Sequence, residues 1–114
     1  MKVDDIVKII NAKIITKSQN NDKDMTYCFA SDLMSDVLTL KVDRILLLTG
    51  LCNIQTIRTA EMANIDVIIF CRGKKVSEDM IEEAEEEGMT LIECKYSIFQ
   101  TSGLLYNNGL KAIY

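Results

Sequence analysis

The 114-residue chain contains no histidine, no proline and no tryptophan, and only 6% of its residues are aromatic. Without histidine it lacks the usual base of a catalytic triad and the commonest metal ligand. Its four cysteines form no CxxC pair, so zinc-type ligand spacing is absent. Neither GxxxxGK[ST] nor GxGxxG occurs, which argues against a nucleoside triphosphatase or a dinucleotide enzyme. We therefore predict no enzyme activity, no catalytic residues and no metal site, and the sequence identifies no cofactor.

Positive charge is also scarce, because 13 basic residues face 17 acidic ones and the net charge is -4. This balance argues against binding to nucleic acid or to an anionic membrane, since both require basic residues that displace counterions. No apolar run approaches the ~20 residues that span a bilayer, and the acidic start of the chain contains no signal-peptide core. We expect a cytoplasmic protein.

The length and the hydrophobic pattern predict one domain over residues 1–114. We expect strands at 13–16, 26–30, 44–49, 66–71 and 90–94, with helices near 3–11, 33–40, 54–63, 78–87 and 98–108. The continuous apolar runs at 44–49 and 66–71 are typical of strands buried on both faces. The alternation predicts an α/β fold with three layers, in which a mostly parallel sheet of βαβ units is flanked by helices. How residues 12–30 join the sheet is left open, and 17–24 is the longest predicted loop.

Capping residues mark the start of most predicted helices. Ser31 or Asp32, then Asn53, Ser77 and Ser97, each stand where a side-chain oxygen can accept from the first turn. Gly88 is placed to end the acidic helix. That helix could attract a basic partner, although a solvated face explains its charges more simply.

Three predicted loops meet at the carboxyl edge of the sheet, where ligands of open α/β sheets bind. They span residues 49–53, 71–75 and 94–97, and each leads into a helix N-terminus that favours an anion. Lys74 and Lys75 add positive charge. We predict that a phosphate-bearing ligand is bound by Thr49, Gly50, Asn53, Arg72 and Gly73. The alternative is that the glycines only permit tight turns and that the basic loop is simply solvated.

Cys52, Cys71 and Cys94 all fall at predicted strand ends on that edge. Together they could bind a soft metal or sense oxidation, whereas small apolar side chains at strand ends would explain them equally well. Cys52 lies just before a predicted helix, where the pKa of a thiol can be lowered. A small enzyme that used Cys52 would require such a lowered pKa.

Gly103 lies inside the last predicted helix and costs ~1 kcal/mol there relative to alanine. Close packing on another element or on a second subunit would offset that cost. With Phe99 and Tyr106 nearby, this helix is a candidate dimer seam, although the default expectation is that these side chains pack inside the monomer.

Several segments resemble the DRTGG domain family, and together they cover nearly the whole chain. They are residues 29–38, 47–51, 54–61, 67–75, the acidic helix, and 96–99 with the helix that follows. The family's Asp-Arg pair would fall near Leu51 and Cys52, and its Thr-Gly-Gly near residues 71–73, where only Gly73 matches. The chain is thus similar to a divergent DRTGG domain standing alone.

DRTGG domains occur beside CBS domains in regulated enzymes, so the resemblance implies an α/β regulatory or subunit-contact module that is usually homodimeric. Because many CBS modules bind adenine nucleotides, it also implies a nucleotide as a candidate ligand. Our first hypothesis is a homodimeric module that senses a phosphate-bearing metabolite. The alternative is a protein–protein interaction module that binds a cytoplasmic partner without a small ligand and without catalysis.

Overall fold

The computed structural model describes residues 1–17 and 24–114. The strands are β1 (Lys13–Thr16), β2 (Tyr27–Ala30), β3 (Ile45–Thr49), β4 (Val67–Phe70), β5 (Thr90–Glu93) and β6 (Lys111–Ala112). The helices are α1 (Val3–Ile9), α2 (Met34–Val37), α3 (Ile54–Met62), α4 (Glu78–Glu87) and α5 (Ile98–Asn107). The strands pair in the order β1-β5-β4-β3-β2-β6. Among the described residues, no helix is long and apolar enough to cross a membrane.

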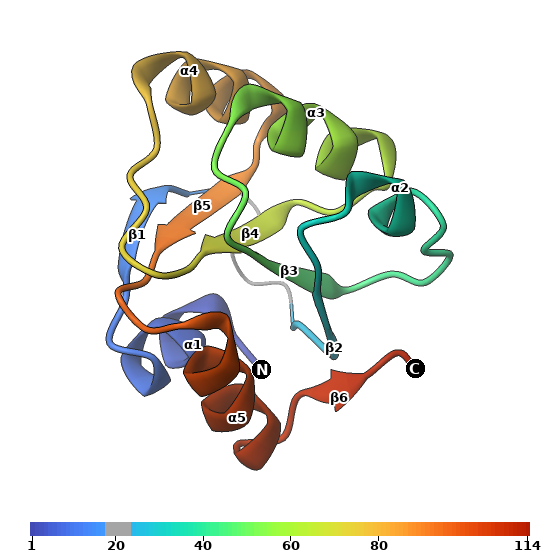
Figure 1. Cartoon of the computed structure of the whole chain (residues 1–114), viewed down its shortest axis with the longest axis vertical. Helices are drawn as coiled ribbons and strands as arrows, with labels where there is room; N and C mark the ends of the chain where they lie inside the picture. The colour runs from blue at the N-terminus through green and yellow to red at the C-terminus, as the bar shows by residue number, and fades with distance from the viewer. Residues whose placement is uncertain (18–23) are drawn as a thin grey trace.

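The sheet is parallel except for β1, which runs antiparallel to β5. Helices α2, α3 and α4 cover one face, and α1 and α5 cover the other (Figure 1). Each face carries its own apolar cluster, with Ile6, Leu48 and Leu105 on the α1/α5 side and Leu47, Ile57 and Met80 on the other side. The predicted fold class is confirmed, with three layers around a mostly parallel sheet.

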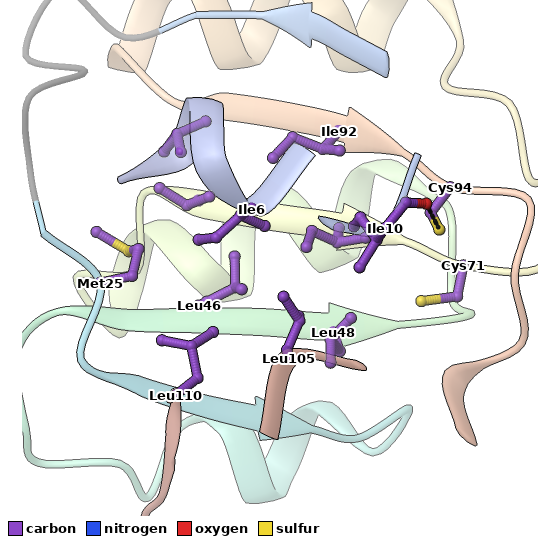
Figure 2. Close-up of a cluster of buried hydrophobic side chains, with 13 residues drawn as sticks. Ile6, Ile10, Met25, Leu46, Leu48, Cys71, Ile92, Cys94, Leu105 and Leu110 are labelled. Atoms are coloured by element: carbon purple, nitrogen blue, oxygen red, sulfur yellow. Dashed lines mark hydrogen bonds between the residues drawn. The ribbon is translucent and has the colours of Figure 1, made fainter. Parts of the chain in front are cut away.

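The two central strands form the middle of the core. Every residue of β3 and β4 is buried, as the two apolar runs predicted. Side chains alternate between the faces, so Leu46 and Leu48 point to the α1/α5 cluster (Figure 2) while Leu47 joins the opposite one. Burial on both faces explains why these strands read as unbroken apolar sequence.

The ends of the chain supply the edges of the sheet. Residues 13–16 pair with β5, and their register shifts by one residue between Ile14 and Thr16. Thr16 fixes this edge, because its Oγ1 donates to the Met89 carbonyl (2.7 Å) and accepts from the Leu91 N–H (3.1 Å). At the other edge β6, which the sequence did not predict, pairs with β2. Most of the predicted loop at 17–24 lies outside the described residues.

The helix expected over 33–40 is much shorter than predicted. It spans only Met34–Val37, and its N-cap position is Leu33. Neither expected cap acts on it, because Ser31 Oγ bonds the Leu33 N–H in a local turn and Asp32 bonds the loop after β3. The apolar spacing of that predicted helix placed Leu33 and Leu38 on its inner face, but the two side chains are 58% and 48% exposed. By contrast, Gly88 ends α4 at φ +68°, as predicted.

Candidate functional site

The loops after β3, β4 and β5 lie together at the carboxyl edge of the sheet. The Cys71 N–H donates to the Thr49 carbonyl (2.9 Å), which continues the β3–β4 pairing into the loops. The Arg72 N–H donates to the Tyr96 carbonyl (2.7 Å), and the Gly73 N–H donates to the Cys94 carbonyl (2.9 Å). The second and third loops are therefore tied together by backbone hydrogen bonds.

The loop after β3 is closed by a carboxylate. Asp32 Oδ1 accepts from Thr49 Oγ1 (2.9 Å) and from the Gly50 N–H (2.7 Å). Thr49 is fully buried, and its Oγ1 also accepts from the Leu51 N–H (3.1 Å). The prediction that Asp32 caps a helix is wrong, because its carboxylate satisfies this loop instead. Two polar groups proposed for a ligand, those of Thr49 and Gly50, are thus already bonded within the chain.

The predicted helix caps behave in two ways. Asn53 caps α3, since its Oδ1 accepts from the Thr56 N–H (3.0 Å). Ser97 caps α5 in the same manner, accepting from the Gln100 N–H (3.1 Å). Ser77 occupies the N-cap position of α4 but makes no cap bond, because its hydroxyl donates to the nearby Asp79 carboxylate. That hydrogen bond lowers the pKa of Asp79.

Arg72 and Gly73 form the turn after β4, both with left-handed backbone at φ +62° and +71°. The Arg72 side chain is exposed and makes no ion pair with a described residue. Next in the loop, Val76 and Lys75 are held by Glu93: its Oε2 accepts from the Val76 N–H (2.9 Å) and its Oε1 lies 3.4 Å from Lys75 Nζ. The five predicted ligand residues therefore fall in two adjacent loops, one closed by Asp32 and one carrying free positive charge.

Two lysines that the sequence analysis did not single out lie beside this loop. Lys95 lies two residues after the end of β5, in the loop that was predicted over 94–97. Lys13 opens β1, opposite Glu93 in the antiparallel register. No local signal at Lys13 indicates its place, because that place depends on β1 pairing with a strand about 75 residues later in the chain.

The cysteines are grouped differently from the prediction. Cys71, Cys94 and Cys28 lie on the α1/α5 face (Figure 2 shows the first two), whereas Cys52 packs on the opposite face. Burial raises the pKa of Cys28 to about 12 and that of Cys71 to about 11. Cys94 Sγ donates to the Ile10 carbonyl (3.5 Å). The predicted trio of Cys52, Cys71 and Cys94 is therefore wrong as a cluster.

Cys52 does not have the lowered pKa that a nucleophile requires. Burial raises the pKa of its thiol and Glu93 raises it further, while Lys74 opposes both effects. The thiol donates weakly to the Lys75 carbonyl (3.4 Å). A protonated thiol without a partner base does not support cysteine catalysis.

An apolar groove lies between α5 and the β2/β6 edge. Its volume is about 330 Å³, and Cys28, Phe99, Gly103 and Tyr106 are among its lining residues. Phe99 is 89% exposed and Tyr106 is 70% exposed, so neither packs inward as expected. A Cβ at Gly103 would meet nothing within 4 Å, so no close packing among the described residues offsets its cost.

Comparisons with known proteins agree with the fold. A family model for the DRTGG domain matches residues 5–107. No curated protein sequence matches the chain. The structure is similar to the crystal structure of the CBS and DRTGG domains of the regulatory region of Clostridium perfringens pyrophosphatase, complexed with its activator diadenosine tetraphosphate. The TM-score is 0.79 at 14% identity, over 91% of this chain and 45% of the length of that chain.

Proposed function

The chain belongs to the DRTGG domain family, and we propose that it is a homodimeric regulatory module that senses a phosphate-bearing metabolite. One observation carries the proposal: a loop with unpaired positive charge meets the start of capped helices at the ligand-binding edge of a parallel sheet. An adenine nucleotide is the first ligand to test, because the similar regulatory region of the pyrophosphatase holds diadenosine tetraphosphate as an activator.

The proposed site consists of Thr49, Gly50, Asn53, Arg72 and Gly73. Arg72 is its principal anion contact, because the guanidinium is exposed and offers paired donors that match phosphate oxygens. The loop from Thr49 to Asn53 forms the adjoining wall. Since its polar groups already bond Asp32 and Thr56, it contributes shape more than new hydrogen bonds.

The first experiment is a thermal-shift screen against AMP, ADP, ATP, diadenosine tetraphosphate and common phosphorylated metabolites. A ligand present at 100 times its Kd adds about 2.7 kcal/mol to the free energy of unfolding. For a domain of this size the melting temperature rises by roughly 10 °C. A screen without any shift would contradict ligand sensing and favour the interaction module.

Arg72→Ala is the variant for this site, with Arg44→Ala as its control. Both arginines are exposed and both have φ +62°, so each substitution changes the backbone strain equally. Arg44 precedes β3 at the opposite end of the sheet. We expect Arg72→Ala to abolish the ligand-induced shift and Arg44→Ala to keep it. Unchanged affinity in Arg72→Ala would overturn this site.

The dimer part of the proposal concerns α5. Phe99, Gly103 and Tyr106 follow one another at helical spacing, expose two aromatic rings beside the apolar groove, and leave open space at the glycine. A second copy of α5 would cover these rings, and Gly103 would let the two backbones approach closely.

Sedimentation velocity tests the dimer with two variants. Phe99→Ser/Tyr106→Ser should yield monomers, because it removes the apolar contact. Gly103→Ala should stabilise the isolated helix by about 1 kcal/mol yet weaken the dimer, because the added methyl group obstructs close approach. A native protein that sediments as a monomer at high concentration would refute this part of the proposal.

A further inference from the structure

A hollow at the carboxyl edge is lined by most of the unpaired positive charge there. It has a volume of about 230 Å³ and is bounded by the turn before β1, the loop after β4 and the loop after β5. Its charged lining residues are Lys13, Lys74, Lys75, Lys95 and Glu93. Arg72 is not among the residues that line it. This lysine pocket therefore adjoins the Arg72 site, and the two have Gly73 in common.

One carboxylate offsets only one of the four lysines. Glu93 is nearly buried, with a side chain 10% exposed, and it pairs with Lys75 at 3.4 Å while accepting from the Val76 N–H. Lys13, Lys74 and Lys95 make no ion pair with any residue that the structure describes. The lysine pocket thus keeps a formal charge of about +3 in a chain whose net charge is -4.

Backbone pairing in the fold determines the positions of the lysines in this pocket. Lys13 stands directly opposite Glu93 in the β1–β5 register. The loop carrying Lys74 is tied to the loop carrying Lys95 by the Gly73 N–H bond to the Cys94 carbonyl. These backbone contacts place the lysines around one hollow.

We propose that the lysine pocket binds the polyphosphate group of a small metabolite, with Lys13, Lys74 and Lys95 as its contacts. Several point-charge donors around one hollow favour a di- or triphosphate over a single phosphate, because each further phosphate adds charge that the extra lysines can meet. The inference rests on the proposed sensing function and deepens it: the anionic end of the ligand extends from Arg72 into this pocket, away from the Asp32 carboxylate beside Gly50.

Isothermal titration calorimetry with inorganic pyrophosphate tests the lysine pocket directly. We expect binding to the native protein and weaker binding of orthophosphate. Lys13→Gln/Lys95→Gln should lower the pyrophosphate affinity about a hundredfold, or roughly tenfold for each charge-assisted hydrogen bond lost. The matched control is Lys41→Gln/Lys111→Gln, which removes the same charge from exposed positions at the opposite end of the sheet and should keep the native affinity.

Two results would overturn the inference: no pyrophosphate binding by the native protein, or an equal loss in both double variants, which would reflect net charge alone. If circular dichroism shows that Lys13→Gln/Lys95→Gln does not fold, Lys74→Gln/Lys95→Gln replaces it and leaves β1 unchanged.

The outcomes separate this inference from the proposed function. A nucleotide that stabilises the native protein and the lysine variant alike, but not Arg72→Ala, leaves the function standing and refutes the lysine pocket. If pyrophosphate binding needs the lysines but no nucleotide shifts the melting temperature, the lysine pocket stands and the proposed nucleotide sensing is refuted.

Discussion

The two halves of the carboxyl edge use their polar groups in opposite ways. In the half formed by the loop after β3, the Thr49 hydroxyl and the Gly50 N–H donate to Asp32, and the Thr56 N–H donates to Asn53. In the half formed by β1 and the loops after β4 and β5, three lysines have no counter-charge among the described residues. In the first half a carboxylate of the chain itself bonds the donors, whereas in the second half three lysines make no ion pair with a described residue.

The difference shows that a glycine-containing loop before a helix is not in itself an anion site. What matters is whether its donors are still free once neighbouring segments have folded against it. At Gly50 the neighbour is Asp32, which comes from the loop after β2 and takes the N–H that a phosphate would need. The following predictions test this contrast, from the largest expected effect to the smallest.

Thr16→Val should have the largest effect, because it removes the hydroxyl that fixes β1 to β5. The buried Met89 carbonyl and Leu91 N–H would both lose their partner, at a cost of about 2 kcal/mol in the free energy of unfolding. Because β1 carries Lys13, pyrophosphate affinity should fall as well. Urea denaturation and calorimetry measure the two effects. Thr39→Val, at an exposed threonine, is the control and should stay within about 0.5 kcal/mol of the native protein.

Asp32→Ala should destabilise the protein by about 1 kcal/mol, since Thr49 Oγ1 and the Gly50 N–H lose their acceptor. The cost is smaller than for Thr16 because Asp32 is exposed and water can partly replace it. The same change removes a negative charge beside the loop after β3, so the affinity of the carboxyl edge for anions should rise. Asp36→Ala, an exposed carboxylate on α2, controls for charge alone. Equal denaturation midpoints for the two variants would contradict the conclusion that Asp32 stabilises the loop after β3.

Glu93→Gln should change stability by less than about 1 kcal/mol, because Lys75 is largely exposed and the amide can still accept from the Val76 N–H. Its main effect is on the lysine pocket, where a fourth lysine becomes free and pyrophosphate should bind more tightly. Glu82→Gln on α4 makes the same charge change at an exposed position away from the pocket. A gain in affinity in both variants would mean that overall charge, and not this site, governs binding.

The smallest expected effect is on the Cys52 thiol. Glu93 contributes to raising the pKa of Cys52, so Glu93→Gln should lower that pKa and increase the thiolate fraction at pH 8. Alkylation by iodoacetamide, followed by peptide mass spectrometry, should be a few-fold faster at Cys52. Cys28 and Cys71 should remain slow, because burial holds their pKa values at about 12 and 11. An alkylation rate at Cys52 that does not change in Glu93→Gln would contradict the effect of Glu93 on the pKa of Cys52.

The sequence predicts the centre of this fold well. The runs around Leu46 and Ile68 have no polar interruption, and such short unbroken apolar runs are typical of strands covered on both faces. Asn53 and Ser97 act as predicted because a cap bonds its own helix within three residues. These signals are local, so no knowledge of the remaining chain is needed to read them.

The misses are residues whose partners are distant in the sequence. Asp32 has the sequence context of a helix cap, but its partners at Thr49 and Gly50 lie 17 and 18 residues away. Lys13 enters the lysine pocket only because β1 pairs antiparallel with β5. Phe99 and Tyr106 share a helical stripe that reads as core, yet the structure leaves both rings exposed. Periodicity identifies a stripe and does not identify what covers it.

The contacts of the N-terminal segment also bear on how the protein is made. Ile10 and Thr16 bond to Cys94 and Leu91, which follow them by 84 and 75 residues. At about 5–20 residues per second, a ribosome needs roughly 4–17 s to add the later partner. During that interval the apolar side chains of Val3, Ile6 and Ile10 lack the part of their cluster that β5 and α5 supply, including Ile92 and Leu105. The segment is therefore translated well before its partners, and it is among the last parts of this domain to be buried.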